Sequence, residues 1–293
     1  MKGDFSRGYG GKFMLGLGLC LVVLDLVFLF AIFPMLTKMP SDYNETYNFE
    51  GQVQALNPAT MSLDTIPTTA TRVLNAQGLT GDDILLMKQD VSFFVAVAGT
   101  PLASLGININ TSEVYAIDRT TRENVSGYGD ADRSGQFTFP ADVQQETYSF
   151  WSSSAKSALP ANFVSEETFQ GLKVYNFKIE AKDLPAGTMA GTGLPQTMDV
   201  LTEIKVEPLS GIPVYTSSTT TLKTTALPVP LFVNQMSFTA ETTDEMVALG
   251  KSSRNLITWA SVYGFWAVLT IGALLIIAYV YNHRLRRGRK SRS

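Results

Sequence analysis

Cysteine and histidine are almost absent from this sequence of 293 residues, which contains only Cys20 and His283. One cysteine cannot form a disulfide within the chain, and between these two residues there is no thiol nucleophile and no thiolate metal site. The same stretch offers no Ser-His pair and no histidine metal ligand. The sequence therefore predicts a protein that is not an enzyme, carries no cofactor and no metal, and depends on core burial for its stability.

Basic residues are scarce in the long middle of the chain. Residues 37–255 contain 14 lysine and arginine residues against 24 aspartate and glutamate residues, a net charge of −10. Such a surface repels nucleic acid, so nucleic acid is not expected as a partner. The two ends are basic, with Lys and Arg before residue 13 and a run of them after residue 281 that contains no acid.

Two apolar runs separate the basic ends from the acidic middle. Residues 13–36 form a run of 24 and residues 256–281 a run of 26. Each can cross a hydrocarbon core of about 30 Å as a helix. Because basic flanks stay on the cytoplasmic side, we expect a plasma-membrane protein with both termini cytoplasmic. The expected order is cytoplasmic tail (1–12), transmembrane helix (13–36), extracytoplasmic domain (37–255), transmembrane helix (256–281) and basic cytoplasmic tail (282–293).

The first apolar run has a second interpretation, as a cleaved signal peptide. Its length exceeds the usual ~7–15 residues of a signal-peptide core, and the following FAIFPMLTKMP lacks an A-x-A-like cleavage site. We therefore expect a retained anchor.

Strand-like patterns dominate between the two runs. Short alternating or β-branched segments punctuated by Gly, Pro, Asn and Asp are YNFEGQVQAL, DVSFFVAVAG, SEVYAIDRTT, GQFTFPADV, LKVYNFKIEA, VLTEIKVEP and IPVYTSSTTTL. Turns are expected at Gln170-Gly171 and at residues 208–211. The predicted fold class is a membrane-anchored, mainly β (α+β) protein with one large antiparallel β-rich domain between two transmembrane helices.

A helix is expected at the end of this domain. Residues 242–245 have the Thr-x-x-Glu form of a capping box, and no proline follows them. The helix either continues into the second apolar run or breaks at residues 250–253, and both alternatives stay open. The stretch PAGTMAGTGLP predicts a long loop.

Asp25 interrupts the first apolar run at its centre. A carboxyl group at that depth is costly and marks a polar partner, a proton path or an oligomer contact. Counting about 12 residues from each cytoplasmic end places Asp25 level with Thr270. We predict a hydrogen bond between the two, with Gly16, Cys20, Gly264 and Gly272 allowing the helices to approach. A tolerated polar residue satisfied by water or headgroups is the alternative.

Two further groups of residues are candidate sites in the domain. Asn44, Asn110 and Asn124 lie in N-x-S/T sequons and are candidate glycosylation sites. Phe137, Phe139, Tyr148 and Trp151 are candidates to line an apolar ligand cavity, although aromatic residues on strands are more often ordinary core.

Several short motifs lie between the two apolar runs: Asp118-Arg119 with Thr121, Phe139-Pro140, Tyr148 with Trp151, Leu159-Pro160-Ala161, Gly171-Leu172 with Val174-Tyr175, and Val206-Glu207-Pro208 with Gly211. This set of motifs resembles that of the PorA-type porin family, actinobacterial and archaeal membrane proteins with two anchors and a largely unassigned role. The resemblance implies the two-anchor topology and the β-rich domain. It is close over residues 114–215, whereas residues 48–106 match only loosely.

These features together predict an envelope protein whose external domain binds a ligand or serves a structural role. The expected partners are the lipid bilayer, further copies of the chain through its helices, and a lipid or envelope ligand. The alternative is transport, either through an oligomer of the helices or through a hydrophobic tunnel as in the two-anchor scavenger receptors, an analogy of architecture alone. A single-chain membrane barrel does not contain long apolar helices, so the strands are not expected to form the pore.

Overall fold

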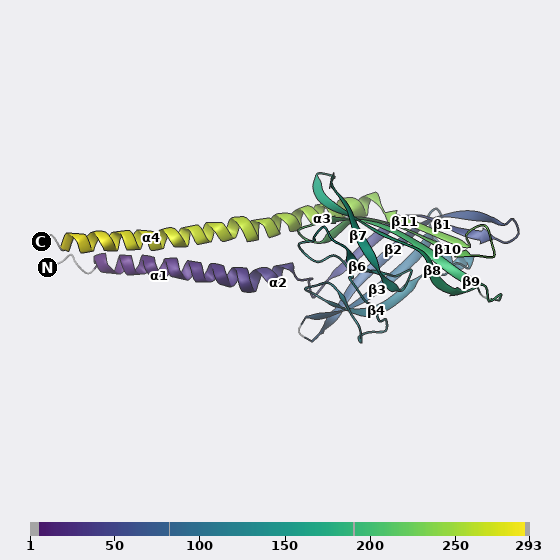
Figure 1. Cartoon of the computed structure of the whole chain (residues 1–293), viewed down its shortest axis with the longest axis horizontal. Helices are drawn as coiled ribbons and strands as arrows, with labels where there is room; N and C mark the ends of the chain where they lie inside the picture. The colour runs from purple at the N-terminus through teal and green to yellow at the C-terminus, as the bar shows by residue number, and fades with distance from the viewer. Residues whose placement is uncertain (1–5, 82, 190, 291–293) are drawn as a thin grey trace. The chain divides into compact units, whose positions relative to one another are not determined.

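The computed structural model describes residues 6–81, 83–189 and 191–290. The chain divides into two units, Met1–Lys38 with Asn255–Ser293, and Met39–Arg254. Figure 1 shows long helices in the first unit and the strands in the second.

The first unit contains two helical segments that run past one another. The first comprises α1 (Ser6–Val27), a π-helical turn η1 (Phe28–Ile32) and α2 (Phe33–Thr37). The second comprises the end of α3 (Ala240–Thr258), a π-helical turn η3 (Trp259–Gly264) and α4 (Phe265–Lys290). Residues Lys12–Met35 and a window within Ala240–Arg284 are long and apolar enough to cross a membrane.

The turn η1 has a local cause in the sequence. Pro34 has no N–H, and its ring clashes with the carbonyl four residues earlier, so the regular ladder cannot continue through it. The N–H of Phe33 accordingly donates to the carbonyl of Phe28, five residues back. The first apolar segment is therefore helical throughout but changes its winding before Pro34.

The second unit is built on one antiparallel sheet of 11 strands, in the order β5-β4-β3-β2-β1-β11-β10-β9-β8-β7-β6. The strands are β1 (Asn44–Asn57), β2 (Ser62–Thr80), β3 (Ile84–Val95), β4 (Thr111–Asp118), β5 (Asn124–Val125), β6 (Tyr148–Ser152), β7 (Ser157–Phe169), β8 (Leu172–Thr188), β9 (Pro195–Glu207), β10 (Ile212–Thr224) and β11 (Phe232–Phe238). A short 3-10 turn η2 (Leu102–Leu105) follows β3. The mainly β, antiparallel fold class is confirmed.

The two edges of the sheet are joined at one residue. Gln136 bridges Glu123 beside β5 and Phe150 in β6. Its N–H donates to the carbonyl of Ser149 at 2.6 Å, and its own carbonyl accepts from Trp151 N at 3.0 Å. On the other side, residues next to Gln136 pair with the chain around β5. Backbone hydrogen bonds at Gln136 therefore link the two outermost strands, β5 and β6, so that the edges of the sheet are paired at this position.

Both predicted turns are confirmed. Gln170 and Gly171 have φ of 46° and 76° and connect β7 to β8, as a two-residue hairpin of this hand requires. Residues 208–211 connect β9 to β10.

Two sequence predictions were wrong, and one strand was missed. GQFTFPADV forms no strand and contributes only the bridging Gln136. The long loop predicted over PAGTMAGTGLP is short, because β8 continues to Thr188 and β9 begins at Pro195. The 19-residue strand β2 matches none of the predicted segments.

Helix α3 begins at Ala240, earlier than the predicted capping box. Thr239 is the capping residue, since its Oγ1 accepts from Thr242 N at 3.2 Å. The side chain of Thr242 instead faces the sheet, where its Oγ1 accepts from the N–H of Asn48 in β1 at 3.2 Å. Residues 250–253 are helical, so the structure has no break there.

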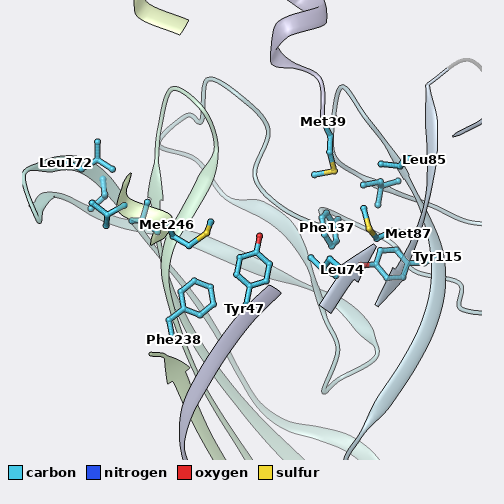
Figure 2. Packing of buried hydrophobic residues seen from close by; sticks show 14 residues of the cluster. Met39, Tyr47, Leu74, Leu85, Met87, Tyr115, Phe137, Leu172, Phe238 and Met246 are labelled. Carbon is cyan, nitrogen blue, oxygen red and sulfur yellow. The ribbon is translucent and has the colours of Figure 1, made fainter. Parts of the chain in front are cut away.

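The core consists of three groups of buried side chains. The largest joins strands β1–β4, β8, β10 and β11 to α3 and contains Met39, Tyr47, Leu74, Met87, Tyr115, Phe137, Phe238 and Met246, among others (Figure 2). A second lies between β6–β9 and the segment containing Phe139, and a third lies around β1–β3 and β11. Figure 2 shows the ring of Tyr47 beside that of Phe238, with the Tyr47 hydroxyl group pointing away from the Phe238 ring.

Candidate functional site

A polar network lies within the largest group of core side chains, and Arg72 is its centre. Arg72 in β2 pairs directly with Tyr47 in β1, so the two side chains project from the same face of the sheet. Tyr47 is buried, and that face is therefore the inner one. The guanidinium of Arg72 lies 5.7 Å from the centre of the Phe137 ring.

One neutral oxygen accepts most of the hydrogen bonds in this network. Oε1 of Gln89, which is 3 % exposed, accepts from Arg72 Nε at 3.1 Å and Arg72 Nη2 at 2.8 Å. The hydroxyl of Tyr115 donates to the same atom at 3.2 Å. Among the residues that the structure describes, no carboxylate lies within ion-pair distance of Arg72. Its positive charge is thus held by an amide and by aromatic rings.

Tyrosine hydroxyl groups complete the donor side of the network. Tyr43 and Tyr47 share one hydrogen bond of 2.7 Å between their hydroxyl oxygens. Burial raises the pKa of Tyr47, and it raises that of Tyr43 well above the usual 10. Burial also raises the pKa of Tyr115. All three groups therefore remain neutral O–H donors at physiological pH.

A second arginine lies beside Tyr115, next to the closure of the sheet. Arg133 is 4 % exposed; its Nη2 pairs with Glu113 at 2.5 Å, and its guanidinium lies 3.5 Å from the centre of the Tyr115 ring. It also lies 5.6 Å from the Trp151 ring. The Nε atom of Arg133 and Nε1 of Trp151 are both buried without a hydrogen-bond partner among the described residues. Two buried donors next to one another therefore lack acceptors.

The family-like motifs meet in a different place, around the β9–β10 turn. Arg122 Nη1 donates to the carbonyls of Phe139 at 2.7 Å and Ser210 at 2.9 Å. Burial lowers the pKa of Arg122 to about 10, which leaves it charged at neutral pH. A Cβ on Gly211 would lie 2.0 Å from the carbonyl oxygen of Pro140. The Phe139-Pro140 motif and the V-E-P-x-x-G motif therefore pack against each other, and the buried Arg122 donates hydrogen bonds to both.

The Asp118-Arg119 motif holds the beginning of the domain. Oδ1 of Asp118 accepts from the N–H groups of Thr120 at 2.8 Å and Thr121 at 2.7 Å, which fixes the turn after β4. Nε of Arg119 donates to the carbonyl of Met39 at 2.7 Å, and the N–H of Met39 donates back to Arg119 at 2.9 Å. This motif therefore anchors the first residue of the domain.

The predicted aromatic ligand-lining residues are packed side chains in this structure. Phe139 is fully buried, and its ring centre lies 4.5 Å from that of Phe177 and 5.3 Å from that of Tyr148. Phe137 lies 5.7 Å from Tyr115, and Trp151 lies against Arg133. The four residues fall in two regions of the domain, and their contacts are those of a core.

The three sequons differ in how free their asparagine side chains are. Asn44 is exposed at the start of β1. Asn110 is exposed, but its Oδ1 accepts from Phe93 N at 2.9 Å. Asn124 is half-buried, and its Nδ2 donates to the carbonyl of Gly135 at 2.9 Å. Asn44 and Asn110 are thus exposed, whereas the Nδ2 atom of Asn124, to which a sugar would attach, is engaged by Gly135.

The structure does not bring Asp25 and Thr270 together. The close approach of the two helical segments is at Gly18 and Gly272, where a Cβ on Gly18 would lie 2.9 Å from the carbonyl of Gly272. Asp25 is 4 % exposed with its Oδ2 unpartnered among the described residues, whereas Thr270 is exposed. With Gly18 opposite Gly272, the antiparallel position facing Asp25 falls near Phe265.

The other residues predicted to allow this approach lie elsewhere. A Cβ at Gly16 would meet nothing within 4 Å, Cys20 is exposed, and Gly264 contacts Trp259 of its own helix. Of the predicted small residues, Gly272 alone lies in the close contact.

Groups of three or more His, Cys, Asp or Glu side chains placed to hold a metal ion do not occur within the described residues.

Comparison with known families decides the membership of this chain. A family model described as Porin PorA matches residues 11–281. The chain belongs to the Porin PorA family. The match spans both apolar segments and the whole sheet, so the PorA family assignment covers parts of both units of the chain. No curated protein matches it.

The PorA-family assignment and the two apolar helices indicate a membrane protein with a β-rich domain. The motifs that carried the resemblance are at structural contacts, whereas the Arg72 network lies outside all of them. Sequence reasoning missed Arg72, because β2 was not among the expected strands. The available signal was the alternation of Ala70, Arg72 and Leu74, which places a charge on an apolar face.

Proposed function

We propose that this PorA-family chain is an integral membrane protein of the cell envelope that presents its β-rich domain outside the cell as a binding module. Both termini are cytoplasmic in this proposal, and the protein has no catalytic role. The two helices act as anchors, and the acidic domain between them meets the ligand.

One observation carries the topology. β1 and β11 pair with Phe49 opposite Phe238, which puts the beginning of β1 and the end of β11 at the same end of the sheet. The chain therefore enters and leaves the domain at one end, as two anchors in one membrane require. The basic residues at both chain ends support a cytoplasmic location for the tails.

The side chains on the outer face of the sheet support a domain in water. Gln52 bonds to Gln235 at 3.3 Å, and Gln54 bonds to Thr65 at 3.2 Å; Gln235 and Thr65 are exposed, and the other two are half-buried. A membrane-spanning barrel instead turns an apolar band toward lipid. We therefore place the strands outside the bilayer.

The experiment is cysteine labelling, since Cys20→Ser gives a chain without cysteine. Into that background, Thr60→Cys in the exposed β1–β2 loop and Arg292→Cys in the tail are introduced separately. A membrane-impermeant maleimide added to intact cells should label the first variant, and should label the second only after permeabilisation. Labelling of the tail in intact cells, or protection of residue 60, would contradict the proposal.

Transport is a second candidate, favoured by the family description as a porin. Because the strands carry packed side chains, a conducting path would pass through an assembly of the apolar helices. Buried Asp25 is the polar group available to such a path. Planar-bilayer conductance from the purified chain that Asp25→Leu abolishes would support transport, and the absence of conductance would remove it.

A further inference from the structure

The lysine residues on the surface of the domain are mostly paired with acids. Ion pairs with carboxylates engage Lys88, Lys173, Lys178, Lys182, Lys205 and Lys223. Among the residues that the structure describes, three exposed basic side chains of the domain form no ion pair: Lys156, Lys251 and Arg254. Two of these three lie three residues apart on α3.

Lys251 and Arg254 are neighbours on the surface of α3, since residues three apart share one side of a helix. Nζ of Lys251 donates to the carbonyl of Gln170 at 2.7 Å, which holds this part of α3 against the β7–β8 turn. An ammonium group has three N–H donors and a guanidinium has five. Two donors of Lys251 and all those of Arg254 thus have no partner among the described residues and can face a ligand.

The acids near this pair are engaged by other side chains. Oδ1 of Asp244 accepts from Nε2 of Gln170 at 2.9 Å, and Glu166 pairs with Lys173 at 2.9 Å. The bond from Glu166 raises the pKa of Lys173, and the positive charge of Arg254 opposes this rise. Arg254 is therefore close enough to Lys173 to repel it, and the positive charge at this place is in excess.

The position of the pair along α3 matches the headgroup layer of a bilayer. α3 continues without a break into the second apolar run, which begins at Leu256. At about 1.5 Å per residue, Arg254 and Lys251 precede Leu256 by about 3 Å and about 8 Å along the helix axis. The polar layer on each side of the hydrocarbon core is about 5–8 Å thick. Both side chains therefore reach the depth of the lipid phosphates when the apolar run crosses the membrane.

We propose that Lys251 and Arg254 bind the phosphate of an anionic phospholipid in the leaflet that faces the domain. The guanidinium fork of Arg254 matches two phosphate oxygens, and Lys251 adds a point charge. A zwitterionic lipid carries its own cation beside the phosphate, so the anionic lipid is preferred. The rest of the domain, with its net charge of −10, repels an anionic surface. This inference rests on the proposed membrane topology and names the lipid class that the chain selects.

The test is quenching of Trp259 fluorescence in bilayers that contain the full-length chain. Trp259 is 63 % exposed and follows Arg254 by five residues, about 8 Å along the helix axis. Trp266→Phe removes the other tryptophan of the apolar run, and Trp151 lies in β6 of the domain. The bilayers hold equal amounts of phosphatidylglycerol and phosphatidylcholine, and the acyl chains of one or the other are brominated. The ratio of the two quenching strengths gives the relative affinity of the lipid site beside Trp259.

Brominated phosphatidylglycerol should quench Trp259 more strongly than brominated phosphatidylcholine does, because each basic residue near an anionic surface favours binding by about fivefold. Arg254→Gln should lower this preference by about fivefold, and Lys251→Gln in addition should bring the ratio close to one. Lys156→Gln is the matched control, since Lys156 is exposed and unpaired as well. It precedes β7 whereas Gln170 follows it, so the strand separates the two places by about 40 Å, and the preference should not change.

Three results would overturn the site. They are equal quenching by the two lipids in the chain with both basic residues, a preference that persists when both are replaced, and an equal loss in Lys156→Gln. Arg254 has no partner within the described part of the chain, so Arg254→Gln should fold and decides the matter even if Lys251→Gln does not fold. Cysteine labelling reports the topology separately, so failure of this inference leaves the proposed membrane arrangement standing.

Discussion

Replacing Gly211 with alanine should destabilise the domain far more than the same change at another glycine with positive φ. Gly211 has φ of 73°, and its Cβ would lie 2.0 Å from the carbonyl oxygen of Pro140. Gly187 has φ of 83° and nothing within 4 Å of a Cβ. Both alanines bear the same left-handed backbone cost of about 1–2 kcal/mol. Only the alanine at 211 must push its neighbour away.

The magnitude follows from the contacts that this movement breaks. Contacts of Cβ shorter than 3.0 Å are essentially never observed, so the two segments must separate by about 1 Å. That shift removes the bonds from Val143 N to Pro208 O at 2.7 Å and from Asp142 N to Leu209 O at 3.1 Å. The bond from Arg122 to Ser210 is lost as well. At about 1 kcal/mol for each neutral bond and about 1.5–3 for a charged donor, the extra cost is about 3–5 kcal/mol.

Calorimetric unfolding of the full chain in detergent measures this difference. At about 2–4 °C per kcal/mol for a domain of this size, Gly211→Ala should unfold about 6–20 °C below Gly187→Ala. Equal unfolding temperatures for the two variants would show that the β9–β10 turn does not depend on its contact with Pro140, and would refute the packing role assigned to these motifs.

Three other changes test separate parts of the molecule. A hydrogen bond from Lys205 lowers the pKa of Glu167. The pair therefore stabilises the fold above the usual carboxyl pKa, and this contribution is lost as the pH falls through the lowered pKa. Lys205→Met removes the bond and should move the midpoint of acid unfolding to higher pH. Gly18→Val should lower the temperature at which the two helical segments unfold, because a side chain there would collide with Gly272. Gly16→Val should leave this temperature unchanged, because a Cβ at Gly16 meets nothing within 4 Å. In a glycosylating host, Asn44→Gln combined with Asn110→Gln should abolish any sugar-dependent mobility shift on gels, whereas Asn124→Gln should not change it.

The parts of the fold that sequence predicted are those with local causes. A two-residue Gln170-Gly171 turn between alternating segments and a Pro-x-x-Gly turn at 208–211 are specified by their own residues, and both form. Length and hydropathy alone identify the apolar helices. These signals need no knowledge of distant partners.

The parts that were missed depend on strand register and on distant pairing. β2 carries Thr68, Ala70, Arg72 and Leu74 on its inner face, a mixture that does not look like a core strand. The pairing of Tyr47 with Arg72 exists only once β1 and β2 have their register. The candidate site could not be assembled from residue types because no local pattern joins its members.

The Asp25–Thr270 prediction failed to match the structure for a related reason. Counting equal lengths from each end assumes that both helices begin at the same depth. The contact of Gly18 with Gly272 sets a register that differs from this assumption by five residues, about one and a half turns. Helix ends do not fix helix register, whereas small residues in contact do.

The neighbouring positions of the first and last strands also set the order in which the domain can fold. β1 and β11 lie side by side in the middle of the sheet, although nearly the whole domain separates them in sequence. During synthesis, β1 to β5 can pair with their neighbours in sequence while the other edge of β1 remains open. Such an edge is prone to association with other chains until its partner arrives. Because β11 is followed directly by α3 and the second apolar helix, the sheet is completed only when synthesis is nearly finished, and a chain that ends before residue 232 should aggregate.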